Sequence, residues 1–102
     1  MSIKNITKPV SEQAASLKNR LANELRQPAP GEVQPLILME GGGIPGSQHI
    51  YVIWDDWRDI SAIERSEIIM DALEEARGRE ACLVITVAMG LTPQEAKRLN
   101  IG

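Results

Sequence analysis

Two residues in this sequence carry side chains that bind metals readily, and each occurs only once: His49 and Cys82. An imidazole nitrogen and a thiolate sulfur are both competent ligands for iron–sulfur centres. Each residue flanks a stretch that we expect to be a β-strand, so neighbouring strands would bring the two side chains together as a cofactor-binding pair. The alternative is a partly exposed histidine at a strand end and a buried cysteine that packs as a small apolar residue. That alternative is the more common situation, because two ligands alone rarely hold a metal.

A glycine-rich segment, Gly41–Ser47, contains the spacing Gly43-Ile44-Pro45-Gly46. The same Gly-X-X-Gly spacing forms the clamp with which KH domains hold a nucleic-acid backbone. That clamp joins two helices, whereas this segment lies between two predicted strands. We therefore expect a flexible hairpin loop, with an anion-binding nest of glycine amides as the alternative. Gly43 and Gly46 are candidate partner contacts.

An acidic and aromatic corner follows the second predicted strand, formed by Trp54, Asp55, Asp56, Trp57 and Asp59. Carboxylates of this kind could bind Mg²⁺, and tryptophan is enriched at protein interfaces. The alternative is structural: the aspartates end the strand and Trp57 packs under the helix that follows.

Three arginines, Arg65, Arg77 and Arg79, could contact phosphates along that helix. Acidic residues surround them, which favours salt-bridged, solvent-exposed faces instead. The sequence shows no catalytic triad, no paired carboxylates in a pocket and no cluster of histidines and cysteines. We therefore do not expect an enzyme.

The elements that position these residues follow from hydrophobic spacing and from capping signals. Apolar residues three and four positions apart predict a helix that begins after Ser11 and ends by Gln27. Ser61 and Glu64, like Thr92 and Glu95, have the spacing of a capping box. The expected elements are a helix at 11–27, a strand within 32–40, a strand at 49–54, a helix at 61–77, a strand at 81–88 and a helix from 92 to near 100. For residues 81–88 a helix is the alternative, but the β-branched residues and the short length favour a strand. Gly78 ends the second helix, Gly90 breaks the last strand, and a break or a second short helix is an alternative near 76–80.

The resulting order, α-β-β-α-β-α, predicts an α+β fold with a three-stranded mixed sheet and helices packed on one face. In the second strand, Ile50, Val52 and Trp54 share one face, and His49, Tyr51 and Ile53 share the other. We expect a flexible N-terminus over residues 1–8 and a single domain over residues 9–102.

Composition limits the function. The chain has 102 residues and a net charge of -3, and an acidic balance argues against a domain that binds duplex nucleic acid on its own. A single cysteine rules out an internal disulfide framework and fits a reducing compartment. No apolar run approaches the length of a membrane span, and the N-terminus lacks an apolar signal core. We expect a cytoplasmic protein that does not enter the membrane.

Several of these residues, between Leu17 and Ala96, resemble the pattern of the BolA family, whose fold is related to the type II KH domain. His49 opens a hydrophobic strand, and Trp57, Ser61 and Arg65 follow at the family's spacing. Leu73 matches the leucine of the next helix, and Leu83, Ile85, Thr92-Pro93 and Glu95 match the third strand and the start of the closing helix. The chain departs from the pattern at four positions: Ile50 replaces an aromatic residue, Asp59 replaces a glycine, Ser66 replaces a histidine, and Ala81 stands where the family has its hallmark histidine. The loop after the third strand is also longer by about two residues.

The resemblance implies a protein-interaction module whose partner is a monothiol glutaredoxin, with roles in iron–sulfur handling or in redox and transcriptional regulation. It implies that an iron–sulfur cluster is shared with that partner rather than held by this chain alone, with His49 and Cys82 as candidate ligands. It also makes Trp57 and Arg65 candidate partner-binding residues. Two alternatives stay open: a KH-like regulator that binds nucleic acid, and a structural or oligomeric module without a ligand.

Overall fold

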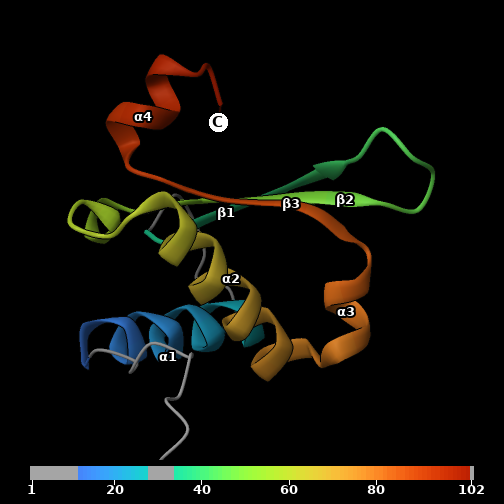
Figure 1. Cartoon of the computed structure of the whole chain (residues 1–102), viewed down its shortest axis with the longest axis horizontal. Helices are drawn as coiled ribbons and strands as arrows, with labels where there is room; N and C mark the ends of the chain where they lie inside the picture. The colour runs from blue at the N-terminus through green and yellow to red at the C-terminus, as the bar shows by residue number, and fades with distance from the viewer. Residues whose placement is uncertain (1–11, 28–33, 102) are drawn as a thin grey trace, which may run out of the picture.

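The computed structural model of the chain describes residues 12–27 and 34–101. The expected flexible N-terminus and the expected helix cap at Ser11 lie outside these residues. The elements are α1 (Glu12–Arg26), β1 (Leu36–Gly41), β2 (Gln48–Ile53), a 3-10 turn η1 (Asp55–Trp57), α2 (Ala62–Arg77), α3 (Arg79–Leu83), β3 (Ile85–Leu91) and α4 (Pro93–Arg98) (Figure 1).

The three strands form one mixed sheet, as the sequence predicts, and their order in the sheet is β1-β2-β3. β1 and β2 are antiparallel, with Leu38 opposite Tyr51, and β2 and β3 are parallel, with Tyr51 opposite Met89. The parallel pair needs a long crossover, which α2 and α3 provide. The α+β fold with a three-stranded mixed sheet is therefore confirmed.

The main core lies between the sheet and the two long helices. The apolar stripe of α1, with Leu17, Leu21 and Leu25, packs with Ile69 and Leu73 of α2 and with the inward side chains of β2. Ile50, Val52 and Trp54 all belong to this core, as the alternation of β2 predicts. Each fully buried aliphatic side chain contributes about 1.5–3 kcal/mol to stability, so this layer holds the domain together.

The capping signals mark where the helices begin and end. The Ser61 hydroxyl accepts a hydrogen bond from the Glu64 amide at 3.2 Å and so caps α2. Gly78, at φ 88°, ends α2 with a backbone conformation that favours glycine. At α4, Thr92 and Glu95 form a complete capping box with Pro93 in the first turn.

The expected strand over residues 81–88 is corrected. Its first three residues belong to α3, and β3 runs from Ile85 to Leu91. Gly78 turns the chain, and a second short helix starts at once, before the strand can form. Gly90 does not break the strand but lies within it, at a point where the Arg65 and Trp57 side chains approach its backbone closely.

α4 packs on the face of the sheet opposite to α1 and α2 (Figure 1). Ala96 of α4 contacts a small second core with Ile53 and Leu91. Asn100, at φ 62°, then reverses the chain, so that the Ile101 amide donates to the Ala96 carbonyl at 2.9 Å and Ile101 packs back against that core. The expectation of helices on one face therefore holds for α1 and α2, whereas α4 partly covers the other face.

Among residues 12–27 and 34–101, no helix has both the length and the apolar character needed to cross a membrane.

Candidate functional site

The two candidate ligands, His49 and Cys82, do not come together. His49 lies on β2 with its side chain on the α4 face of the sheet, and its Nδ1 is 3.3 Å from the Tyr51 hydroxyl and 3.4 Å from Glu40 Oε1. Cys82 lies on α3 rather than beside a strand, packs against the core on the other face, and its thiol donates to the Met70 carbonyl at 3.6 Å. The prediction that they form a ligand pair is wrong, because the sheet separates them.

Cys82 is also a poor ligand in its own right. Burial raises the pKa of its thiol, and the nearby carboxylates of Glu74 and Asp71 raise that pKa further. The thiolate is the form that binds metals and reacts. Within the described part of the chain, no group of three or more histidine, cysteine or acidic side chains is placed to hold a metal. His49 and Cys82 therefore do not form a shared ligand pair, and a cluster held jointly with a partner stays a prediction.

The candidate partner contacts Trp57 and Arg65 are both buried, with 0% and 7% of their surface exposed. The Trp57 indole donates to the Val52 carbonyl at 3.0 Å. The Arg65 guanidinium donates to the Ile60 carbonyl at 2.8 Å, to the Gly90 carbonyl at 3.2 Å and to Glu95 Oε1 at 2.6 Å. The expectation that they touch a partner is corrected: they join the end of β2, the start of α2, the end of β3 and α4.

Two further residues, Gly90 and Glu95, complete this arrangement. The sequence patterns mark them only as a strand break and as part of a capping box. A Cβ atom on Gly90 would lie 2.8 Å from the Arg65 Cβ and 3.0 Å from the Trp57 ring, so only glycine fits there. The pKa of Glu95 is lowered, first by the hydrogen bond from the Thr92 amide and then by Arg65. We call Trp57, Arg65, Gly90 and Glu95 the Arg65 cluster. The signal for Gly90 was a lone glycine in an apolar run, which often marks close backbone approach.

Side chains of α2 also cover the free edge of β3. Ser66 Oγ donates to the Ala88 carbonyl at 2.7 Å, and Arg65 donates to the Gly90 carbonyl two residues further. Alternate carbonyls of a strand point to the same side, and the Leu91 carbonyl bonds the Trp54 amide on the opposite side. The carbonyls of Ala88 and Gly90 are thus unavailable to another strand, which protects this edge from pairing.

The Gly43–Gly46 segment forms the tip of the β1–β2 hairpin. The Ser47 amide donates to the Ile44 carbonyl at 2.9 Å, and Gly46 has φ 85°. Pro45 and Gly46 are the residues that a type II turn prefers at its two central positions. Ile44 is 69% exposed at this tip. The segment is a hairpin turn and not a KH clamp; the helix junction where such a clamp would lie holds Arg77-Gly78-Arg79 instead.

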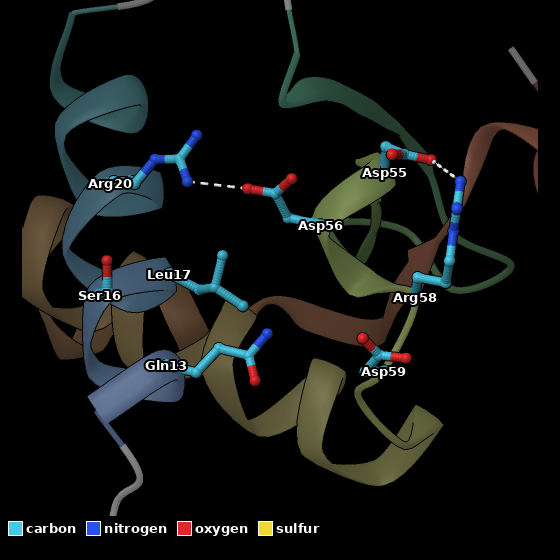
Figure 2. Close-up of a pocket in the computed structure, with 8 residues that line it drawn as sticks. All are labelled: Gln13, Ser16, Leu17, Arg20, Asp55, Asp56, Arg58 and Asp59. Carbon is cyan, nitrogen blue, oxygen red and sulfur yellow. Dashed lines mark hydrogen bonds and ion pairs between the residues drawn. The ribbon is translucent and has the colours of Figure 1, made fainter.

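The acidic corner lines a pocket of about 380 Å³ against the first half of α1 (Figure 2). Asp56 pairs with Arg20 at 2.8 Å, and Asp55 pairs with Arg58 at 2.6 Å. The Arg20 guanidinium also lies 4.9 Å from the ring of Trp54, which is itself buried. Two of the three carboxylates are thus neutralised by arginines, which favours the structural interpretation over a Mg²⁺ site.

The sheet face that carries α4, which we call the outer face, changes character along the strands. Nearest α4, Ile53 and Leu91 are buried. In the next row, Leu38 and Tyr51 are half-buried and Met89 is 36% exposed. The last row, toward the hairpin, consists of Glu40, His49 and Val87.

The polar groups of the outer face are linked. The Tyr51 hydroxyl donates to Glu40 Oε1 at 2.9 Å, and this bond is the main cause of the raised pKa of Tyr51. The outer face therefore offers an apolar centre bordered by a hydrogen-bonded polar edge, a composition typical of protein interfaces.

No protein-family model matches this chain, and neither a curated protein nor a solved structure matches it.

Proposed function

We propose that this chain is a BolA-like protein-interaction module that binds a monothiol glutaredoxin through the outer face and the adjoining hairpin tip. It acts by docking and not by catalysis. The partner class comes from the resemblance of the Trp57, Ser61 and Arg65 spacing to the family pattern.

The outer face is the observation that carries the proposal. Around Leu38, Tyr51 and Met89 it is mainly apolar: Leu38 packs partly against the small core under α4, Tyr51 is half-buried and Met89 is 36% exposed. Apolar surface that remains exposed beside a rigid scaffold is typical of an interaction site. Ile44 is also exposed, at the hairpin tip beyond the row of Glu40 and His49.

The fold supports the family assignment. Apart from the additional short helix α3, the element order and the mixed sheet are those expected from the sequence, and the spaced residues lie between the end of β2 and the first turns of α2. Ser61 caps that helix and Trp57 and Arg65 are buried beneath it. The motif therefore builds the scaffold, and the partner contacts lie on a different surface.

A shared iron–sulfur cluster does not form part of this proposal, because His49 and Cys82 lie on opposite faces of the sheet. His49, with its side chain 25% exposed, is the one imidazole that the chain could offer at the outer face.

The test is isothermal titration calorimetry of the purified protein with a monothiol glutaredoxin, in its apo form and with a reconstituted cluster. Met89→Glu places a charge on the outer face, and we expect it to weaken binding by at least about tenfold, or about 1.4 kcal/mol. Ile63→Glu is the control, because Ile63 is also an exposed apolar residue, at 74% against 36% for Met89, but lies in the first turn of α2. Absence of binding to both forms of the glutaredoxin, or equal loss in both variants, would falsify the proposal.

A further inference from the structure

A second surface of the molecule lies on the helix side of the sheet, where α1 and α2 leave a groove of about 420 Å³ between them. Its floor is apolar and consists of two small side chains of α1, Ala14 and Ala15, and the buried Ile68 of α2. Small side chains at a helix surface let another chain approach closely. The proposed glutaredoxin site on the outer face does not include any of these residues.

The rim of this groove is acidic. Asp71, Glu74 and Glu75 of α2 line it, with Lys18 of α1 as the one basic residue among the lining side chains. Lys18 already pairs with Glu75 at 2.9 Å, and Arg26 approaches the same carboxylate at 3.6 Å. Within the described residues, Asp71 and Glu74 make no ion pair or side-chain hydrogen bond, so two exposed carboxylates border the apolar floor without a counter-charge.

We propose that the groove between α1 and α2 docks a basic amphipathic helix of a partner protein, with its apolar stripe on Ala14, Ala15 and Ile68 and its lysines or arginines at Asp71 and Glu74. This interaction goes beyond the proposed glutaredoxin binding and uses the other side of the sheet.

Charge complementarity identifies the occupant. Asp71 and Glu74 are three residues apart on one helix face, about 5–6 Å between Cβ atoms, which matches basic residues three or four apart on a docked helix. A nucleic acid would bring phosphates against these carboxylates. A second copy that docked by two-fold symmetry would bring the same acidic rim against itself. A helix with an apolar stripe and basic flanks satisfies both the floor and the rim.

The test uses a fluorescein-labelled peptide of about 18 residues, built from leucine, alanine and lysine with one leucine face flanked by lysines. The first comparison peptide has the same composition in shuffled order, and the second has glutamate in place of lysine. Binding is followed by fluorescence anisotropy at about 50 mM and about 300 mM salt, because exposed ion pairs weaken with ionic strength. We expect only the lysine-flanked amphipathic peptide to bind, and to bind more weakly at the higher salt.

Three variants locate the site. We expect Asp71→Lys to weaken peptide binding by at least about tenfold, and Ala15→Gln, which fills the floor without adding charge, by at least about fivefold. Asp59→Lys makes the same change in net charge in the pocket of Figure 2 and should stay within about twofold of the parent affinity. Circular dichroism melts establish that each variant is folded before it is titrated.

The alternatives give different results. Equal binding of the shuffled or glutamate peptide, no binding of the amphipathic peptide, or equal losses in Asp71→Lys and Asp59→Lys would each overturn the inference. So would a dimer seen by sedimentation that Asp71→Lys dissociates, since the occupant would then be a second copy. Failure here is separable from failure of the proposed function, because Met89→Glu should leave peptide binding unchanged and Asp71→Lys should leave glutaredoxin binding unchanged.

Discussion

Gly90 shows how a single missing side chain fixes the geometry of the Arg65 cluster. Trp57 and Arg65 lie against the backbone of β3 so closely that a Cβ atom would be 2.8 Å from the Arg65 Cβ. Neither neighbour can move freely, because Trp57 is bonded to Val52 and Arg65 to three acceptors. Arg65 thus uses its N–H donors within the fold. We infer that its spacing from Trp57 and Ser61 reflects a structural role.

We expect Gly90→Ala to destabilise the protein by about 1–3 kcal/mol, the usual effect of overpacking. Urea unfolding followed by tryptophan fluorescence measures this change. Gly43→Ala is the matched control, since a Cβ there meets nothing within 4 Å, and its effect should stay within about 0.5 kcal/mol. Equal stability of the two variants would show that the close contact at Gly90 is not a constraint.

Glu95 should make the stability of the protein depend on acid pH. Its pKa is lowered from the ordinary value of 4.5, first by the Thr92 amide and then by Arg65. A lowered folded-state pKa means that the carboxylate stabilises the fold above pH 4.5 and loses that contribution as the pH falls through the folded-state value. The stability advantage of the parent protein over Glu95→Gln should therefore shrink as the pH is lowered from neutral to below 4.5.

Urea titrations at several pH values measure that difference. Glu67→Gln serves as the control, because the Glu67 carboxylate has no ion pair within residues 12–27 and 34–101. A constant gap between parent and Glu95→Gln across the whole pH range would contradict the role assigned to the Glu95 carboxylate.

The Cys82 thiol should react slowly in the folded protein. Burial raises its pKa, and Glu74 and Asp71 raise it further, so little thiolate forms near neutral pH. We expect iodoacetamide to label native Cys82 at least about tenfold more slowly than the urea-unfolded chain, as measured by intact-mass spectrometry. Comparable rates would show an accessible thiolate and reopen the case for Cys82 as a ligand.

At the scale of elements, local signals predicted most of the fold. Helix caps at Ser61 and Thr92 depend on hydrogen bonds within four residues, and the alternation in β2 depends on one strand. The start of β3 depends on tertiary contacts instead. The apolar run from Ala81 is compatible with a helix or a strand. A short helix, α3, follows Gly78 and includes the first three residues of this run before β3 begins. The placement of α4 on the outer face has no local signal, because it depends on where Ile53 and Leu91 point.

The candidate site failed for the same reason. His49 and Cys82 each flank a predicted strand in the sequence, but Cys82 lies in α3, which ends before β3 begins and packs its thiol against the main core. The spacing pattern does not show where this short helix lies, and it likewise cannot show that Trp57 and Arg65 are buried.

The capping box of α4 should determine how firmly that helix covers the outer face. The Thr92 hydroxyl accepts from the Glu95 amide at 3.2 Å, and the Glu95 carboxylate accepts from the Thr92 amide at 2.8 Å. We expect Thr92→Ala to lower the free energy of unfolding by about 1 kcal/mol, with faster hydrogen exchange at the Leu99 and Ile101 amides. Ser16→Ala, an exposed position within α1, should change stability by less than about 0.5 kcal/mol. Unchanged exchange in Thr92→Ala would show that tertiary packing alone holds α4.

For the whole molecule, the two faces of the sheet present different surfaces. The face with α1 and α2 holds the main core and, on its far side, the acidic groove. The outer face is only partly covered, and its central row is half-buried and mainly apolar, with Met89 exposed. Met89 lies on the outer face and Asp71 lines the groove on the opposite side of the sheet, so a substitution at one of these positions need not disturb the other. This separation is what allows Met89→Glu and Asp71→Lys to test two proposals independently.

The charge of the whole molecule argues against the KH-like alternative. The net charge is -3 and the isoelectric point is about 5.1. The helix junction at Gly78 does carry Arg77 and Arg79, but Arg77 already donates to the Leu25 carbonyl at 3.4 Å, and Glu74, Glu75 and Glu80 lie close in sequence. Affinity for nucleic acid rises with the number of phosphates that cations neutralise, and two arginines neutralise about two.

We therefore expect dissociation constants weaker than about 100 µM for single-stranded RNA, single-stranded DNA and duplex DNA at physiological salt. Anisotropy titrations at about 50 mM and about 200 mM salt measure both the affinity and its salt dependence. Micromolar binding that falls steeply with salt, and that Arg77→Gln with Arg79→Gln abolishes, would instead establish the helix junction as a nucleic-acid site. Because those arginines belong neither to the outer face nor to the lining of the acidic groove, that result would leave both docking proposals to be decided by their own variants.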